Sequence, residues 1–137
     1  MLKGPAPHLA LGRQGEEAAA GILRGAGMSI LDRNWREGRL ELDLVCKDGD
    51  TVVFVEVKTR ATTERGGPAG AITPAKRRSV SRAAQAWLAA HEAWDAPCRF
   101  DVVCLVARDG TFSAEHYRHA FDFVPPLDRG HAPWQPW

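Results

Sequence analysis

The alternation of apolar and polar residues predicts two β-strands joined by a tight turn in the first half of the chain. Apolar residues recur at every second position along residues 39–46 and again along 51–59, as they do when alternate side chains of a strand face a core. Asp48-Gly49 between the two runs is a strong signal for a hairpin turn. We therefore expect an antiparallel hairpin centred on this dipeptide.

Patterns of longer period predict one helix before this hairpin and one after it. Residues 11–26 are rich in alanine, leucine and glutamate and end in a stretch that contains glycine. In residues 73–92, Thr73-Pro74 suits a helix cap and first turn, and apolar residues recur on one helical face. Residues 61–71 are rich in glycine and small polar residues, so we expect a loop there.

Short apolar runs predict the remaining strands. Residues 29–35 are typical of a short strand, and the nearly continuous apolar run at 99–107 predicts a strand that is covered on both faces and reached by a helical crossover. A last strand is expected at 111–115, with irregular chain beyond it. The predicted organisation is a flexible segment at 1–10, one α/β domain at 11–124 and a tail with proline and tryptophan at 125–137.

Length and composition are typical of one globular domain. The chain has 137 residues, of which 45% are hydrophobic and 26% charged, and it is too short for two separate cores. No apolar run approaches the roughly eighteen residues of a membrane span, and no signal-peptide pattern begins the sequence, so we expect a cytoplasmic protein with no membrane partner. Cys46, Cys98 and Cys104 form no CxxC pair and are interpreted as core residues.

Charged residues interrupt the apolar pattern of the predicted hairpin. Glu41 and Asp43 in its first strand, with Glu56 and Lys58 in its second, can share one face. The expected turn sets Glu41 opposite Glu56 and makes Asp43 a diagonal neighbour of Glu56. Carboxylates placed in this way destabilise a sheet unless a cation lies among them. Oxygen ligands favour Mg²⁺ or Mn²⁺ over Zn²⁺, and Lys58 would place its ammonium near a phosphate oxygen or an attacking water.

The first predicted helix adds another candidate carboxylate. Glu16 shares a helical face with Ala19, Ala20 and Leu23, so we expect it to face the sheet, whereas Glu17 is expected to face outward. The alternative explanation for Glu16 is favourable negative charge in the first turn of a helix.

The net charge of +1 conceals a basic segment after the hairpin. Residues 58–82 contain seven basic residues and one acidic residue, a net charge of +6, so the rest of the chain sums to −5. A solvated helix face is one explanation, but beside a carboxylate cluster it favours a polyanion that carries metal ions. Lys76 shares a face with apolar residues and is able to turn toward the sheet, whereas Arg78 and Arg82 are better placed to meet phosphates. The predicted nucleic-acid contacts are Arg60, Lys76, Arg78 and Arg82.

Five segments, in this order, resemble the YraN-like family of bacterial endonuclease-like proteins. They are "GRQGEEAAAGIL", "ELDLV", "FVEVKTR", "ITPAKRR" and "CRFDVV", and the resemblance covers roughly residues 11 to 106. That family is similar to Holliday-junction resolvases and restriction endonucleases. The resemblance implies an α/β fold with a restriction-endonuclease-like αβββαβ core, in which a mixed sheet is flanked by helices.

The same resemblance implies roles for individual residues. The motif of an Asp, a variable spacer, an Asp or Glu, any residue and a Lys corresponds to Asp43, Glu56, Val57 and Lys58. Asp43 and Glu56 would ligate the metal, with the Val57 carbonyl as a further ligand, and Lys58 would activate or orient water. Glu16 would support the site. The chain departs from the family at Leu40, which replaces the glycine that usually precedes the Glu of "GEIDL".

Two functions follow as hypotheses. The first is a metal-dependent endonuclease that hydrolyses phosphodiester bonds in DNA, including branched or recombination and repair intermediates, with Mg²⁺ or Mn²⁺ as cofactor. The second is a non-cleaving module with a nuclease-like fold that binds nucleic acid or acts as a scaffold. The sequence leaves open DNA or RNA, the shape of the substrate, and a monomer or a homodimer. His116 and His119 are interpreted as surface or packing residues rather than half of a metal site.

Overall fold

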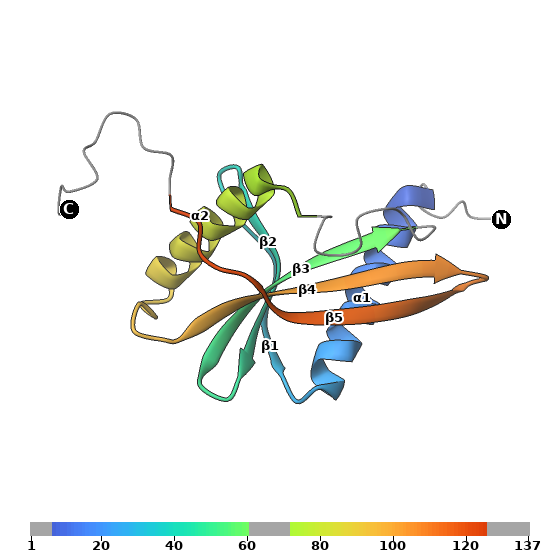
Figure 1. The fold of residues 1–137 in the computed structure, drawn as a ribbon, viewed down its shortest axis with the longest axis horizontal. Helices are drawn as coiled ribbons and strands as arrows, with labels where there is room; N and C mark the ends of the chain where they lie inside the picture. Colours follow the sequence, from blue (N-terminus) through green and yellow to red (C-terminus); the bar gives the residue numbers. More distant parts are fainter. Residues whose placement is uncertain (1–6, 61–71, 126–137) are drawn as a thin grey trace.

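Seven elements make up the part of the chain that the computed structural model describes, residues 7–60 and 72–125. In chain order they are α1 (Pro7–Gly25), β1 (Ser29–Glu37), β2 (Leu40–Asp48), β3 (Thr51–Arg60), α2 (Pro74–Ala90), β4 (Cys98–Arg108) and β5 (Thr111–Phe121). The first six confirm the predicted αβββαβ core (Figure 1). The predicted loop at 61–71 and residues 126–137 of the predicted tail lie outside the described ranges.

The strands form one mixed sheet in the order β1-β2-β3-β4-β5. Neighbouring strands are antiparallel except β3 and β4, which are parallel and are joined through α2. A parallel pair requires a long crossover of this kind, whereas the antiparallel pairs are joined by short turns. The predicted α/β fold with a helix-flanked mixed sheet is therefore confirmed. In the described residues, no helix combines the length and the apolar character needed to cross a membrane.

The core consists of two apolar clusters, one on each face of the sheet. Phe54 and Phe100 pack with Trp87 in the cluster beneath α2. Val53 lies with Leu23 in the cluster beneath α1. Because adjacent residues of a strand face opposite sides, the near-continuous apolar runs of β3 and β4 fill both clusters, as predicted.

The hairpin turn lies one residue later than predicted. Asp48 pairs with Thr51, so the two-residue loop is Gly49-Asp50. Gly49 has a φ of +60°, a left-handed conformation that glycine adopts without steric cost and that tight hairpin turns require. The turn is therefore built on the predicted glycine, but the centre of the hairpin is displaced.

The displaced turn changes which charged residues face one another. The β2–β3 pairing ends at Leu44 and Val55, so the prediction that Glu41 lies opposite Glu56 is wrong. One further step in this register would set Asp43 opposite Glu56. The two strands separate at this point, and the pairing stops just where the two carboxylates meet.

Strand β2 also loses its regular alternation at Asp43. Leu42 and Val45 both belong to the cluster beneath α2, and Leu40 packs against that cluster, whereas Leu44 lies in the cluster beneath α1. The predicted alternation along residues 39–46 sets Leu40, Leu42 and Leu44 on one face, and this is wrong for Leu44. The alternation is therefore interrupted between Leu42 and Leu44, the two neighbours of Asp43.

Two elements are longer than predicted. Helix α1 begins at Pro7 rather than at residue 11, and β5 runs to Phe121, so the expectation of irregular chain beyond residue 115 is wrong. The β4–β5 pairing shifts between Phe100 and Val102, and His119 in β5 has a φ of +53°. This bulge interrupts the alternation by which a strand is identified from sequence.

Candidate active site

Asp43 and Glu56 meet at the end of the β2–β3 pairing. The Val57 N–H donates a hydrogen bond of 2.8 Å to Asp43 Oδ2, which fixes that carboxylate beside β3. Glu56 is buried, with 3% of its surface exposed, and Asp43 is partly buried. The structure thus brings together the two carboxylates that the sequence motif predicts as metal ligands.

Burial and mutual repulsion shift the acidity of both carboxyl groups. Loss of solvent, followed by the nearby charge of Asp43, raises the pKa of Glu56 to about 7. Loss of solvent also raises the pKa of Asp43, although the Val57 N–H and the Lys76 charge oppose the rise. A buried carboxylate beside a partly buried one is costly to ionise, which is typical of a functional site.

Lys76 reaches this pair from the first turn of α2. Its Nζ lies 3.4 Å from Glu56 Oε1, and 40% of its side chain is exposed. Burial lowers the pKa of Lys76, but the Glu56 and Asp43 carboxylates outweigh burial and raise it above its ordinary value. The structure confirms that Lys76 turns toward the sheet, whereas its contact with nucleic acid stays a prediction.

Lys58 and Arg60 continue along β3 beyond Glu56. Lys58 is exposed and pairs across the sheet with Cys104 of β4, and Arg60 is partly exposed. Burial raises the pKa of the Cys104 thiol, and the charges of Arg60 and Lys58 oppose the rise, so both cations lie near this thiol. Both basic side chains therefore lie on the side of Glu56 that leads away from the hairpin turn.

The other predicted contacts of nucleic acid lie on α2. Arg78 is partly exposed and Arg82 is exposed, both within a helix whose buried residues include Val80 and Trp87. The structure places them on the same helix as Lys76, about half a turn and nearly two turns further along. Their role in binding stays a prediction.

Glu16 approaches the site from α1 because Gly15 lets the helix lie close to β3. A Cβ atom at Gly15 would lie 2.3 Å from Thr59 Oγ1, closer than atoms can pack. Asn34 Nδ2 donates to Glu16 Oε2 at 3.0 Å, and the charge of Glu16 contributes to the raised pKa of Asp43. Glu16 is partly exposed and thus supports the acidic site from its edge.

Asn34 is a site residue that the sequence analysis missed. It lies in β1, where its φ of +49° is one that asparagine tolerates better than most residues. The β1–β2 pairing has Arg33 opposite Leu44 and Trp35 opposite Leu42, on either side of Asn34. An asparagine within a strand gives no signal of such a conformation, so only the folded arrangement identifies it.

The donor set of this site suits Mg²⁺ or Mn²⁺. In a strand, the N–H and C=O of one residue point toward the same neighbour. Because the Val57 N–H points to Asp43, its carbonyl also points to the β2 side, past the end of the pairing. Within residues 7–60 and 72–125, no group of three Asp, Glu, His or Cys side chains could hold a metal, so side chains alone would supply only two ligands here. Two carboxylates and a carbonyl, completed by water and phosphate oxygens, match the way proteins bind Mg²⁺.

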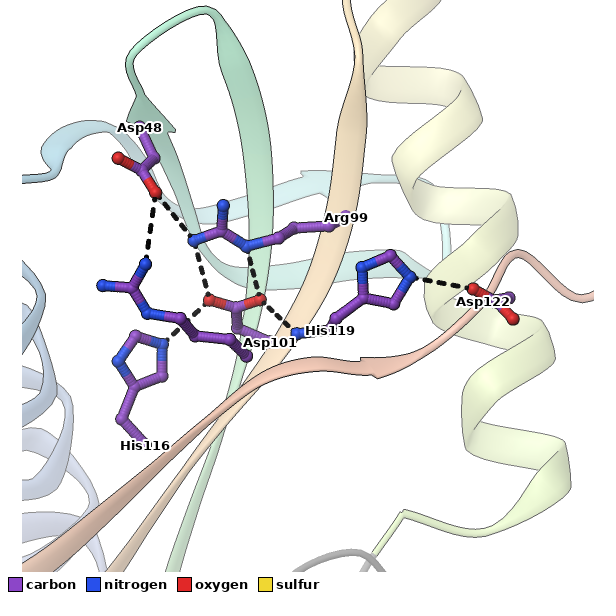
Figure 2. Close-up of polar contacts among 7 residues, drawn as sticks. Asp48, Arg99, Asp101, His116, His119 and Asp122 are labelled. Atoms are coloured by element: carbon purple, nitrogen blue, oxygen red, sulfur yellow. Dashed lines mark hydrogen bonds and ion pairs between the residues drawn. The ribbon is translucent and has the colours of Figure 1, made fainter.

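A second buried carboxylate, Asp101, pairs with a residue of the cluster beneath α1, so it lies on the opposite face of the sheet from Glu56. Its charge is compensated by the neighbours drawn in Figure 2. Asp101 pairs with Val55, the neighbour of Glu56, and is 0% exposed. Arg99 donates to both of its oxygens, at 3.0 and 3.3 Å, and the His119 backbone N–H donates at 3.0 Å. The sequence analysis missed this residue. Its hydrogen bond from the His119 N–H ties the bulge of β5 to β4.

The two histidines of β5 belong to the same region. His116 Nε2 lies 2.8 Å from Asp101 Oδ2, and its side chain is 13% exposed. His119 is exposed, and its Nε2 lies 3.1 Å from Asp122 Oδ1 (Figure 2). Asp48 Oδ2, at the hairpin turn, lies 3.0 Å from Arg99 Nη2. His116 is therefore a largely buried partner of Asp101, whereas His119 lies at the surface.

Comparison with known proteins identifies relatives over most of the chain. Residues 15–105 match the model of the Uncharacterised protein family UPF0102. A UPF0102 protein of Nitratidesulfovibrio vulgaris (strain DP4) is 52% identical over 128 residues, which cover 93% of this chain and 96% of that protein. A UPF0102 protein of Lawsonia intracellularis is 46% identical over 127 residues, with 93% and 96% covered.

Among solved structures, SfsA of Pyrococcus furiosus in complex with Ca²⁺ is similar to this chain at a TM-score of 0.42 and 14% identity. The similarity covers 77% of this chain and 63% of that chain. The sequence relatives settle the family, and they agree with the predicted resemblance. The chain belongs to the UPF0102 (YraN-like) family.

Proposed function

We propose that the protein is a metal-dependent endonuclease that hydrolyses phosphodiester bonds, with DNA as its substrate. The observation that carries this proposal is the meeting of Asp43 with the buried Glu56 where the β2–β3 pairing ends. Like charges in this position make the sheet less stable. A bound cation would compensate their repulsion, and this gives the pair a functional reason to exist.

Three groups of this chain would hold the metal. They are the carboxylates of Asp43 and Glu56 and the carbonyl of Val57. The bound metal would neutralise negative charge on the phosphate and lower the pKa of a water molecule. The Val57 N–H keeps the Asp43 carboxylate in one orientation, and Glu16, held by Asn34, adds negative charge at the edge of the site.

Lys58 would act on the phosphate rather than on the metal. A protonated ammonium has no lone pair for a metal, but it can donate to a non-bridging phosphate oxygen or to the attacking water. Lys58 is exposed and lies two residues beyond Glu56 on β3, which leaves its ammonium accessible to a substrate. Arg60, Arg78 and Arg82 would contact further phosphates and position the strand.

A cleavage screen tests this proposal. Single-stranded, duplex, flap and four-way DNA, with RNA of the same shapes, would be incubated with Mg²⁺ or Mn²⁺ under single-turnover conditions. Lys58→Met keeps the apolar stem and removes the charge, and cleavage should fall roughly a hundredfold or more, as when one preorganised contact is lost. Lys47→Met, at an exposed lysine of β2 near the hairpin turn, is the matched control and should cut normally.

Two results would contradict the proposal in different ways. Cleavage by Lys58→Met at the wild-type rate would remove the catalytic assignment of this site. Binding of nucleic acid without cleavage of any substrate, together with no affinity for Mn²⁺, would favour the non-cleaving binding module instead.

A further inference from the structure

Lys76 supplies a positive charge to the two carboxylates of the candidate site. We propose that Lys76 is a built-in counter-cation that a divalent metal displaces, so that its ammonium moves outward and becomes available to a phosphate of bound nucleic acid. This inference rests on the proposed metal site and describes how that site is kept ready in its metal-free state. The contacts of Lys76, its place in α2 and its exposure carry the inference.

Lys76 stands where a helix by itself disfavours a lysine. The positive end of the helix dipole lies at the first turn, where acidic residues are stabilising and basic ones are not. The first turn of α2 contains no acidic residue. Thr73 Oγ1 accepts the Lys76 N–H at 3.1 Å and Pro74 follows the cap, so the start of the helix is fixed with Lys76 directed at Glu56. The nearby carboxylates of Glu56 and Asp43 offset the unfavourable position of Lys76 in the first turn of the helix.

The Lys76 contact differs from the permanent ion pair on the other face of the sheet. Arg99 and Asp101 form a two-pronged pair in which the side chains are 15% and 0% exposed (Figure 2). Among residues 7–60 and 72–125, the Lys76 ammonium forms one ion pair, at 3.4 Å to Glu56, and 40% of its side chain is exposed. A flexible, partly exposed lysine held in this way can move into water at small cost, whereas the buried Glu56 cannot follow it.

A divalent ion would compensate the pair better than one ammonium does. Asp43 and Glu56 carry two negative charges when ionised, and Lys76 supplies one positive charge. A metal that enters must compete with Lys76, because both are held by the same Glu56 carboxylate. Removing the Lys76 charge should therefore strengthen metal binding, which is the opposite of the expectation for a residue that helps to hold the metal.

Calorimetric titration of Mn²⁺ into wild type and Lys76→Met, without nucleic acid, tests this competition. The buffer should be well above the pKa of about 7 of Glu56, so that protons do not replace the lysine. Lys76→Met should bind Mn²⁺ roughly tenfold more tightly, the change expected for loss of one charged contact. Lys76→Gln provides a second neutral variant, and Arg78→Met, which removes a neighbouring charge of α2, should change the affinity much less.

The outcomes separate the inference from the proposed function. If the wild type binds Mn²⁺ and both Lys76 variants bind it with equal or lower affinity, the counter-cation role is overturned and the metal site stands. No Mn²⁺ binding by any of the proteins would overturn both the counter-cation role and the proposed metal site.

Reductive methylation of the wild type reads out the accessibility of the Lys76 ammonium directly. Modification of Lys76 should be slow without Mg²⁺ and at least several-fold faster with it, whereas modification of Lys47 should be unaffected. Equal protection of Lys76 in both states would contradict displacement.

Discussion

Replacing Glu56 by glutamine should make the metal-free protein more stable, by an amount that grows as the pH rises from about 4.5 to about 7 and is largest above that. The folded protein raises the pKa of Glu56 from 4.5 to about 7. Between these values the folded state binds a proton that the unfolded state has released, so the stability of the wild type falls as the pH rises through this window. Above pH 7 the folded wild type carries the full cost of an ionised, buried carboxylate.

The size of the effect follows from the same shift. A rise from 4.5 to about 7 corresponds to about 3 kcal/mol of unfolding free energy, as an order of magnitude. Glu56→Gln keeps the shape of the side chain but does not titrate, so it should match the wild type near the lower end of the window and exceed it by up to about this amount above pH 7. Lys76 loses its ion-pair partner in this variant, but its half-exposed ammonium can be solvated.

Urea unfolding of both proteins in metal-free buffer, at several pH values from below 4.5 to above 7, measures the difference directly. Glu41→Gln is the matched control, because Glu41 is an exposed residue of β2 whose Oε2 lies 3.3 Å from Arg36 Nε, and it should change stability little at any pH. Parallel pH dependence of wild type and Glu56→Gln, or a lower stability of Glu56→Gln above pH 7, would show that an ionised Glu56 does not destabilise the fold.

Two further predictions concern the packing of α1 and the basic face of α2. Gly15→Ala should destabilise the protein by roughly 1–3 kcal/mol in urea unfolding, because the new Cβ collides with Thr59, whereas Gly21→Ala, with open space around it, should be neutral or stabilising by up to about 1 kcal/mol. Equal effects would show that α1 does not depend on this close approach. Arg78→Ala with Arg82→Ala should weaken binding to all nucleic-acid sequences alike and reduce the salt slope by up to about two; unchanged binding in a salt titration would make this face merely solvated.

The order of elements was predictable because each has a local cause. Thr73-Pro74 does begin a helix, with Thr73 as its cap, and the apolar run at 99–107 is a strand covered on both faces. The glycine-containing turn between two alternating segments predicts the hairpin itself. These patterns involve residues that are close in sequence, so the structures they predict do not depend on distant contacts.

The register of the hairpin was not predictable in the same way. Asp48-Gly49 and Gly49-Asp50 are both acceptable turn dipeptides, and the choice between them moves every pairing across the hairpin. The folded chain selects Gly49-Asp50 and breaks the alternation of β2 at Asp43. This is why the expected hairpin correctly made Asp43 a neighbour of Glu56 but wrongly set Glu41 opposite Glu56.

The partners of the site carboxylates come from elements far away in sequence. Asn34 reaches Glu16 from β1, and Lys76 reaches Glu56 from α2. Helical periodicity correctly turns Lys76 toward the sheet, but it does not say which residue of the sheet it meets. Contacts of this kind depend on the crossing of α2 over β2 and β3, which no local pattern contains.

Titration of Mn²⁺ into the metal-free wild type and into the double variant Asp43→Asn with Glu56→Gln measures whether these two carboxylates form a metal site. The wild type should bind Mn²⁺ and the double variant should not, while circular dichroism shows the variant to be folded and at least as stable without metal. Equal Mn²⁺ affinity in both proteins, or a large loss of metal-free stability in the variant, would show that the two carboxylates are structural.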